Sequence, residues 1–265
     1  MNPRWKAAAA ALMTAAAMTI PALGAEVEAN GTLLSPEEGW VEAGTSYMTL
    51  RAFAARTGCQ LSWASGQASL SGDRLELTAQ PDSLYVTVNG RALYVEGGVP
   101  VRDGKMALPL RVLAQATGAG LTWDAARSTA VLDTAGTSPA RASYNEEDLY
   151  WLSRVISAEA RGESLEGQIA VGNVVLNRVA SSQFPNTVKG VVFDRKNGVQ
   201  FEPISNGTIY DEPVDSAVVA AKLCLEGADV VGDCLYFYAP ALSKGTWIVN
   251  NRTYHTTIGC HRFYT

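Results

Sequence analysis

The sequence predicts two domains: an α+β domain built from a tandem repeat, followed by a mostly α-helical domain with a small β element. Three observations predict this arrangement. Residues 50–63 recur as residues 110–123, a stretch rich in small residues follows at 135–144, and helical periodicity begins at Asn145. The chain has 265 residues, 47% of them apolar, which is enough for two separate cores.

Residues 1–25 have the pattern of a secretory signal peptide. Arg4 and Lys6 give a positive start, an apolar run extends over residues 7–20, and small residues at 22–25 offer a cleavage site. The alternative is an uncleaved N-terminal anchor. In either case we expect a secreted, extracytoplasmic protein, and no later stretch is apolar enough to span a membrane.

The charge of the chain excludes a general nucleic-acid binder. The formal net charge is −5, and removal of Arg4 and Lys6 with the signal takes it to about −7 (−5 minus 2). Nucleic-acid binding depends on Lys and Arg that neutralise phosphates, so we expect no nucleic-acid partner.

The chain has four cysteines, and a location outside the cytoplasm would allow them to form disulfide bonds. Cys224 and Cys234 are close enough in sequence to close a short loop, but three connectivities of Cys59, Cys224, Cys234 and Cys260 stay open. The chain has no CxxC pair and no HExxH sequence. We therefore expect no zinc site, no other metal and no cofactor.

The repeat lies within a first domain at residues 28–134. Leu, Arg, Ala, Thr, Gly, Leu and Trp recur in place, at seven of fourteen aligned positions. Each unit predicts a short helix from its Leu-Arg pair to the glycine of its Thr-Gly pair, where a C-cap needs positive φ. An alternating strand with the Trp follows, and then a second strand, at 67–71 in one unit and 129–132 in the other.

Between the two units, alternating runs at 84–88 and 92–95 flank Asn89-Gly90, which predicts a β-hairpin. Residues 28–134 resemble the copper amine oxidase N-terminal-like domain. This stretch contains no His and one Cys, so we expect no copper site. Two interpretations stay open: a wall-binding or spacing module, and a stalk without a specific ligand. Residues 135–144 read as a linker.

The second domain, at 145–265, begins with a helix that carries a carboxylate on its apolar face. Asn145 is a good N-cap, and we expect the helix to extend to about Ala160. Glu159 follows Leu152 and Ile156 at helical spacing, on the apolar face. Desolvation there raises the pKa of a carboxyl group, which suits a general acid. The structural alternative is a buried Glu paired with Arg161 or Arg178.

The rest of this domain predicts helices, loops and short strands. Gly162 ends the first helix, and we expect a long surface loop at 197–213 that contributes to binding. The other expected elements are helices at 165–179 and 214–226, a turn at 184–186, a strand at 235–238 and a strand-like segment at 258–264.

Residues 147–264 resemble the spore-cortex-lytic cell wall hydrolases in an ordered series of motifs. The motifs are Ser157–Glu163, Glu166–Val171, Val175–Val179, Phe184–Val188, Gln200-Phe201, Leu235–Tyr238 and Ile258–Tyr264. The resemblance implies a lysozyme-like domain related to lytic transglycosylases, placed in the cell wall or the spore envelope. Its partner would be the glycan strands of peptidoglycan, cleaved between N-acetylmuramic acid and N-acetylglucosamine during spore cortex lysis in germination.

The resemblance places the catalytic Glu of the family at Glu159. A hydrolase, in contrast to a transglycosylase, needs a second carboxylate. Glu163 is the nearest candidate, although we favour a structural charge that holds the turn between two helices through Arg161 or Arg178. We also expect substrate binding at Gln168, Gln200, Phe201, Tyr238 and His261. The alternatives are core or loop positions for Gln200, Phe201 and Tyr238, and a structural hydrogen-bonded histidine for His261.

One departure concerns the first domain. Members of the family often carry a different, helical peptidoglycan-binding domain at that position, which leaves open whether cortex or vegetative wall is cut. Two competing functions also remain: a non-catalytic wall-binding module, and a metal-dependent wall amidase. Glu159 in place argues against the first, and the scarcity of histidines (His255 and His261) argues against the second. The sequence does not set the oligomeric state.

Overall fold

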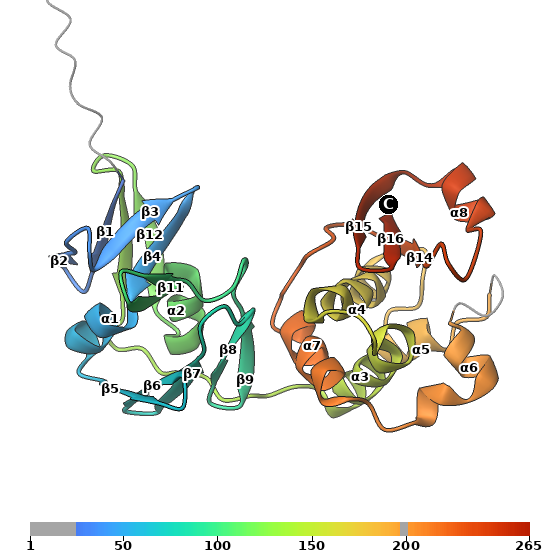
Figure 1. Ribbon diagram of the computed structural model, residues 1–265, viewed down its shortest axis with the longest axis horizontal. Helices are drawn as coiled ribbons and strands as arrows, with labels where there is room; N and C mark the ends of the chain where they lie inside the picture. Colours follow the sequence, from blue (N-terminus) through green and yellow to red (C-terminus); the bar gives the residue numbers. More distant parts are fainter. Residues whose placement is uncertain (1–24, 197–200) are drawn as a thin grey trace, which may run out of the picture.

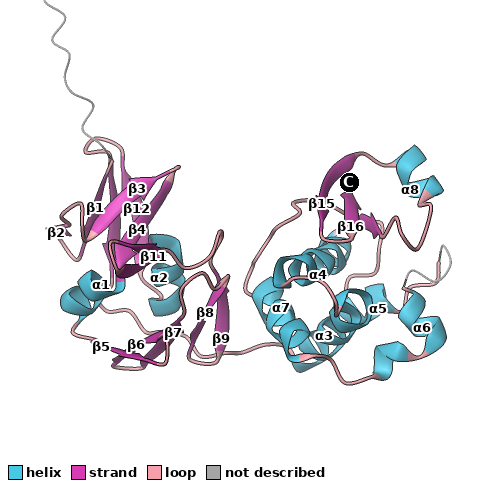
Figure 2. Ribbon diagram, in the orientation of Figure 1, coloured by secondary structure: helices cyan, strands magenta, loops and turns pink. Residues whose placement is uncertain are grey.

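The computed structural model describes residues 25–196 and 201–265. The described chain forms two lobes, a β-rich lobe up to residue 133 and a helical lobe from residue 146. An extended stretch of chain connects the two lobes (Figures 1 and 2). The expected signal peptide covers residues 1–25, of which 1–24 lie outside the described residues. None of the described helices has the length and hydropathy of a membrane span.

The first lobe contains three sheets around two short helices. Its helices are α1 (Leu50–Thr57) and α2 (Leu110–Thr117), and its strands are β1 (Glu26–Ala29), β2 (Thr32–Leu33), β3 (Gly39–Glu42), β4 (Thr45–Thr49), β5 (Gln60–Ala64), β6 (Gln67–Gly72), β7 (Leu75–Ala79), β8 (Tyr85–Val88), β9 (Arg91–Tyr94), β10 (Val101–Arg102), β11 (Lys105–Pro109), β12 (Gly120–Asp124) and β13 (Thr129–Asp133). The strand orders are β12-β13-β1-β2, β10-β11-β4-β3 and β5-β6-β7-β8-β9.

The two similar stretches of sequence adopt the same local structure. Both α1 and α2 end at a glycine in the left-handed region, Gly58 at φ 74° and Gly118 at φ 73°, as the sequence predicts. The hairpin β5–β6 follows α1, and the hairpin β12–β13 follows α2. The Asn89-Gly90 turn is also confirmed, because β8 and β9 pair directly around it and both turn residues have positive φ.

One apolar core fills the first lobe. Phe53 of α1 and Leu113 of α2 pack there against buried side chains of all three sheets. These include one side chain from each sheet, namely Met48, Leu70 and Leu132. Full burial of such side chains contributes about 1.5–3 kcal/mol each. The core therefore places the two helices at fixed positions relative to the hairpins that follow them.

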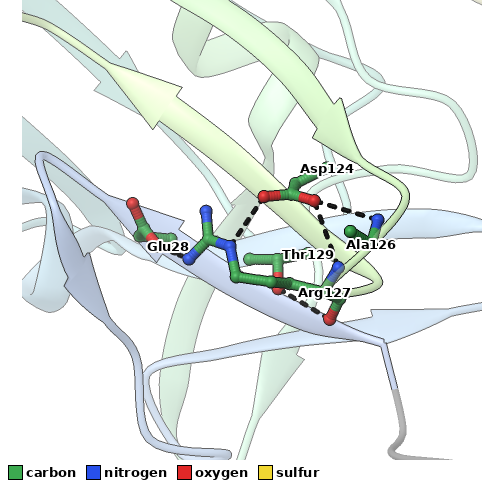
Figure 3. A network of polar contacts seen from close by, with 5 residues as sticks. All are labelled: Glu28, Asp124, Ala126, Arg127 and Thr129. Atoms are coloured by element: carbon green, nitrogen blue, oxygen red, sulfur yellow. Dashed lines mark hydrogen bonds and ion pairs between the residues drawn. The ribbon is translucent and has the colours of Figure 1, made fainter.

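An arginine ties the end of the first lobe to its beginning. Arg127, in the turn between β12 and β13, lies 2.6 Å from Glu28 on β1 and 2.6 Å from Asp124 (Figure 3). Strand β1 pairs parallel with β13, so these ion pairs add to backbone hydrogen bonds between segments about a hundred residues apart. The β12–β13 hairpin is thereby anchored.

The second lobe is built on three packed helices. Its elements are α3 (Glu146–Ala160), α4 (Leu165–Ala180), α5 (Val188–Val192), α6 (Glu202–Asn206), the 3₁₀ helix η1 (Thr208–Tyr210), α7 (Asp215–Leu225), β14 (Tyr236–Tyr238), α8 (Thr246–Asn251), β15 (Tyr254–Ile258) and β16 (His261–Tyr264). Helices α3, α4 and α7 contact one another, and the small sheet β14-β16-β15 lies at one end of α4 (Figure 1).

The three long helices agree with the sequence predictions within two residues at each end. Asn145 caps α3 by accepting a hydrogen bond from the Asp148 amide at 3.0 Å. Two predictions were wrong in detail. The expected loop at 197–213 contains α6 and η1, and the expected strand at 258–264 is the second half of a hairpin that turns at Gly259.

The two lobes meet where β9 contacts α7. The Arg91 guanidinium donates hydrogen bonds to both carboxylate oxygens of Glu226, at 3.0 and 2.7 Å, and a third to the Gln115 carbonyl at 2.9 Å. Ala92 packs into the core of the helical lobe. A bidentate pair of this kind fixes orientation as well as distance, so the first lobe is held against the helical lobe.

All four cysteines lie within the described residues, and all four are unpaired. Cys224 and Cys234 are buried in two separate apolar clusters of the helical lobe, whereas Cys260 is exposed. Burial raises the pKa of the Cys224 thiol far above its ordinary value, which keeps it protonated.

Candidate active site

Helix α3 brings Glu159 to the edge of the helical core. Leu152, Val155 and Ile156 are fully buried on the inner face of α3, which fixes the helix rotation. Glu159 follows in the last turn and is half-buried. Helix α3 ends at Ala160, so Glu159 lies next to the loop that connects α3 to α4.

A buried cation lies within electrostatic reach of Glu159. Arg178 on α4 is 5% exposed, and its Nε donates to the Leu235 carbonyl at 2.8 Å. Burial lowers the pKa of Arg178 to about 10, although electrostatic interactions with Tyr236, Asp194 and Glu159 oppose this shift. Arg178 therefore remains charged at neutral pH and stabilises negative charge nearby.

Aromatic rings surround this cation. The Arg178 guanidinium lies 5.1 Å from the ring centre of Phe184, 5.3 Å from that of Phe201 and 5.7 Å from that of Tyr236. Phe201 is only 2% exposed, so it packs in the core and presents no face for sugar stacking. Gln200, its expected partner in substrate binding, lies outside the described residues.

The aromatic contacts continue from Tyr236 to the surface. Arg252 lies over Tyr236 at 4.5 Å and over Trp247 at 4.8 Å, and it donates to the Tyr236 hydroxyl at 2.9 Å. Trp247 on α8 is 55% exposed. Sequence reasoning missed Tyr236, Trp247 and Arg252, because these residues come together only through the fold of α8 against β14.

Glu163 has a different environment, four residues beyond Glu159. Its Oε2 accepts a hydrogen bond from the Cys260 amide at 3.1 Å, and its Oε1 lies 3.8 Å from Nδ1 of His261. The Glu163 side chain is 12% exposed. These partners lie in the β15–β16 turn, whereas the sequence analysis expected Arg161 or Arg178.

Two glycines make room for the Glu163 side chain. A Cβ atom at Gly259 would lie 1.8 Å from Oε2 of Glu163, and one at Gly167 would lie 2.9 Å from its Cβ. Gly259 also has a φ of +56°, a conformation that favours glycine. The hairpin turn can therefore reach Glu163 only because these two positions lack side chains.

Gln168 and His261 belong to the same cluster as Glu163. Gln168 is buried and its Nε2 donates to the Glu163 carbonyl at 3.3 Å. His261 packs edge-on against Phe237 at 5.3 Å, and burial lowers its pKa while the Glu163 charge raises it. The structure thus brings together Glu163, Gln168 and His261, three of the residues singled out in the sequence.

Tyr238 lies on β14, apart from that cluster. It is half-buried, its ring lies 5.9 Å from that of Tyr264, and the Gly245 backbone packs against its face. No group of three or more His, Cys, Asp or Glu side chains with metal-binding geometry occurs in residues 25–196 and 201–265.

Comparisons with known proteins match both lobes. The family described as Cell Wall Hydrolase matches residues 162–264, and the copper amine oxidase N-terminal domain matches residues 28–132. A spore cortex-lytic enzyme of Oceanobacillus iheyensis is 32% identical over 216 residues, which cover 79% of this chain and 70% of that enzyme. The chain belongs to the spore cortex-lytic cell wall hydrolases.

Other members of the family match a smaller part of the chain. A spore cortex-lytic enzyme of Bacillus cereus is 37% identical over 105 residues, 40% of this chain and 39% of that enzyme. The solved catalytic domain of the germination-specific lytic transglycosylase SleB from Bacillus anthracis is 35% identical, with a TM-score of 0.43, and covers 48% of this chain and 100% of that domain.

As a spore cortex-lytic cell wall hydrolase, the chain is a peptidoglycan-cleaving enzyme, which confirms the enzyme class expected from its motifs. The match to the cell wall hydrolases begins at residue 162, so Glu159 lies three residues before it (162 minus 159). Glu163, Gln168, Arg178, Tyr238 and His261 all lie within the matched segment.

Proposed function

We propose that this cell wall hydrolase is a lytic transglycosylase that cleaves the bond between N-acetylmuramic acid and N-acetylglucosamine, with Glu159 as its single catalytic acid and base. The observation that carries the proposal is the position of Glu159, half-buried at the end of a core helix and close to a buried cation. Residues 145–265 form the catalytic domain, and spore cortex lysed during germination is the substrate, in line with the relatives' names.

The reaction needs one carboxyl group in two protonation states. Glu159 first donates its proton to the glycosidic oxygen, and the bond between that oxygen and C1 of the muramic acid breaks. The Glu159 carboxylate then takes the proton of the muramic 6-hydroxyl, whose oxygen closes onto C1. The products are a 1,6-anhydromuramic end and a free 4-hydroxyl, and no water is consumed.

Arg178 assists by its charge. When Glu159 has given up its proton, the resulting carboxylate lies in a partly desolvated place, where an isolated anion is costly. The positive charge of Arg178 offsets that cost, and the ring faces around Arg178 hold the guanidinium in position.

Glu163 does not serve as a second catalytic carboxylate in this proposal. Both of its oxygens face the β15–β16 turn, one toward the Cys260 amide and one toward His261. A nucleophile or a water-activating base needs an oxygen aimed at the sugar. We assign Glu163, Gln168 and His261 to positioning the hairpin beside the α3–α4 loop.

We also assign sugar contact to Trp247, whose exposed indole is stacked on Arg252 beside Tyr236. Tyr238 on the same small sheet and Gln200 complete the substrate-binding set. The Trp247→Ala variant tests this assignment, with a several-fold rise in KM at nearly constant kcat expected. An unchanged KM on soluble glycan fragments would remove Trp247 from the substrate site.

The remaining parts of the proposal concern export and the first lobe. Residues 1–25 direct secretion, residues 28–134 form a tandem-repeat domain that binds the wall, and residues 135–144 link it to the catalytic domain. The repeat is supported by the recurrence of residues 50–63 at 110–123 and by the equal order of α1, β5, β6 and α2, β12, β13.

Mass spectrometry of fragments released from purified peptidoglycan tests the catalytic proposal. The chain from residue 26 onward is incubated with spore cortex and with vegetative sacculi, beside its Glu159→Gln variant. We expect fragments lighter than hydrolysis products by one water molecule, and none from the variant. Hydrated fragments would replace the transglycosylase mechanism by hydrolysis, and no release from either substrate would leave a non-catalytic wall-binding protein.

A further inference from the structure

Two grooves of the first lobe are lined by equivalent residues. The first groove, of about 520 Å³, is lined by Leu50, Arg51, Leu61, Ser62 and Trp63. The second groove, of about 770 Å³, is lined by Leu110, Arg111, Leu121, Thr122 and Trp123. Each residue of the first set lies sixty positions before its counterpart in the second (110 minus 50, and so on).

Each groove also takes a wall from the other half of the lobe. The turn at 104–106 completes the first groove, and its equivalent at 44–46 completes the second. This exchange follows from the pairing of β4 with β11, in which Met48 lies opposite its own counterpart Leu108. An antiparallel pair centred on equivalent residues relates the two halves by a local two-fold axis, and the axis generates two like grooves.

Large apolar side chains in these grooves face solvent. Trp63 is 59% exposed and Trp123 is 55% exposed, while Leu61 and Leu121 are both 38% exposed. Their strands, β5 and β12, are edge strands of their sheets. Folding gains little from an indole left in water, and contiguous exposed apolar surface marks a binding site. The same exposure at two equivalent positions argues against chance.

A cation accompanies the indole in each groove. Arg51 and Arg111 each follow the first residue of a helix, and both are exposed. Among the described residues, neither guanidinium forms an ion pair or a side-chain hydrogen bond. Their five N–H donors are therefore available to a ligand.

The two grooves differ in net charge. The charged side chains that line the first groove are Arg51 and Lys105, both cationic. The second groove reaches the helical lobe and adds Glu96, Glu226 and Asp229 to Arg111. A carboxylate-bearing ligand is attracted to the first groove, whereas the excess of carboxylates in the second groove disfavours such a ligand relative to an uncharged sugar.

We propose that both grooves bind the glycan strands of peptidoglycan, with a sugar ring packed on the Trp63 or Trp123 indole and its polar substituents bound by Arg51 or Arg111. The proposal deepens the wall-binding part of the proposed function and rests on it. A pyranose has an apolar face of C–H groups that packs on the π face of an indole, and a ring of hydroxyl and N-acetyl oxygens that accept hydrogen bonds from a guanidinium.

Charge complementarity favours this occupant over a second copy of the chain. The protein carries a formal net charge of −5, yet the first groove is cationic. Peptidoglycan offers carboxylates beside its muramic sugars, from the stem peptide or from a lactyl group that carries no peptide. Two grooves on one lobe also give bivalent attachment to one polymer, and linked sites exceed the affinity of either alone by about 10²–10⁴-fold.

Sedimentation with insoluble sacculi tests the proposal. All variants carry Glu159→Gln so that the sacculi stay intact, and the chain starts at residue 26. We expect Trp63→Ala and Trp123→Ala each to weaken binding about 10-fold, and the double variant about 100-fold or more. The Leu33→Ala variant is the matched control, because Leu33 is exposed in the same lobe and lines neither groove.

A second pair of variants separates binding from folding. Arg51→Ala and Arg111→Ala change exposed helix positions that the fold does not need. We expect Arg51→Ala to lower both the affinity and its dependence on salt, and Arg111→Ala to lower the affinity alone. Binding of the double Trp variant within about 2-fold of the parent, at an unchanged unfolding midpoint, would overturn the proposal.

Competition by soluble fragments shows which part of peptidoglycan, the glycan or the peptide, occupies the grooves. Chitotetraose, a soluble tetramer of N-acetylglucosamine, should displace the protein from sacculi and quench the fluorescence of Trp63 and Trp123. Displacement by free stem peptides, without an effect of chitotetraose, would mean that a peptide pairs with the β5 and β12 edges, and would overturn the glycan assignment. Fragment release by the chain with intact Glu159 is scored separately, so a failure of catalysis is distinguishable from a failure of the grooves.

Discussion

Glu159 and Glu163 are four residues apart, and the fold gives them different surroundings. Glu159 lies in the last turn of α3, half-buried, with the cation of Arg178 within electrostatic reach. Glu163 lies in the loop after α3, bound to the Cys260 amide and close to His261. The comparison teaches that two carboxylates near each other in sequence are told apart by their surroundings, because a backbone amide and a histidine hold Glu163 whereas a buried cation lies near Glu159.

The largest expected effect on activity comes from removing the ionisable proton of Glu159. Glu159→Gln keeps the size of the side chain but cannot transfer a proton, so we expect kcat to fall about 10²–10⁴-fold. The free energy of unfolding should stay within about 0.5 kcal/mol of the parent. Turnover of soluble glycan fragments and urea unfolding measure the two quantities, and a retained kcat would remove Glu159 from the mechanism.

For Glu163→Gln we expect a clear loss of stability and only a small loss of kcat. The Cys260 amide then donates to a neutral amide oxygen instead of a carboxylate, and the loss of the charge weakens such a bond by about 1 kcal/mol. The unfolding free energy should fall by about that amount, with a loss of kcat much smaller than for Glu159→Gln. A kcat loss as large as that of Glu159→Gln, together with unchanged stability, would make Glu163 the second catalytic carboxylate.

The Gly259→Ala variant tests whether the β15–β16 turn depends on its contact with Glu163. A Cβ atom there would lie 1.8 Å from Oε2 of Glu163, and the φ of +56° is unfavourable for alanine. Strain of this kind costs about 1–3 kcal/mol. Because the clash requires the Glu163 side chain, Gly259→Ala and Glu163→Ala, which truncates that side chain, should be non-additive in urea unfolding. Simple additivity would mean that the turn and Glu163 are independent.

The parts of this site that sequence predicts are the local ones. Asn145 as a cap, the helical spacing of Leu152, Ile156 and Glu159, and the glycine that ends each short helix of the first lobe all depend on neighbours within a few residues. The same local signals predicted both Trp hairpins and the Asn89-Gly90 turn.

The parts that escaped prediction depend on contacts between distant residues. Glu163 and Cys260 are 97 residues apart, and nothing near either residue identifies its partner. Gly259 looked like an ordinary glycine within a strand, although its positive φ makes the hairpin turn. Strands β1 to β4 are short and were missed. Two of them pair with strands far along the chain, β1 with β13 and β4 with β11, and β2 and β3 pair with these two.

His261 provides the smallest expected effect, which is a pH dependence of stability. Burial lowers the pKa of His261 below its ordinary value of about 6.5, so the unfolded chain binds this proton more readily than the folded one. The stabilising contribution of the neutral imidazole is therefore complete above about pH 6.5 and is lost as the pH falls through the folded pKa.

Two variants isolate this contribution. His261→Asn should flatten the acid side of the curve of unfolding free energy against pH. The Glu163 charge raises the pKa of His261 and so limits the loss. Glu163→Gln should therefore make the loss of stability between neutral pH and about pH 5 steeper than in the parent. An identical slope in the two proteins would show that the Glu163 carboxylate, 3.8 Å from Nδ1, does not act on the imidazole through its charge.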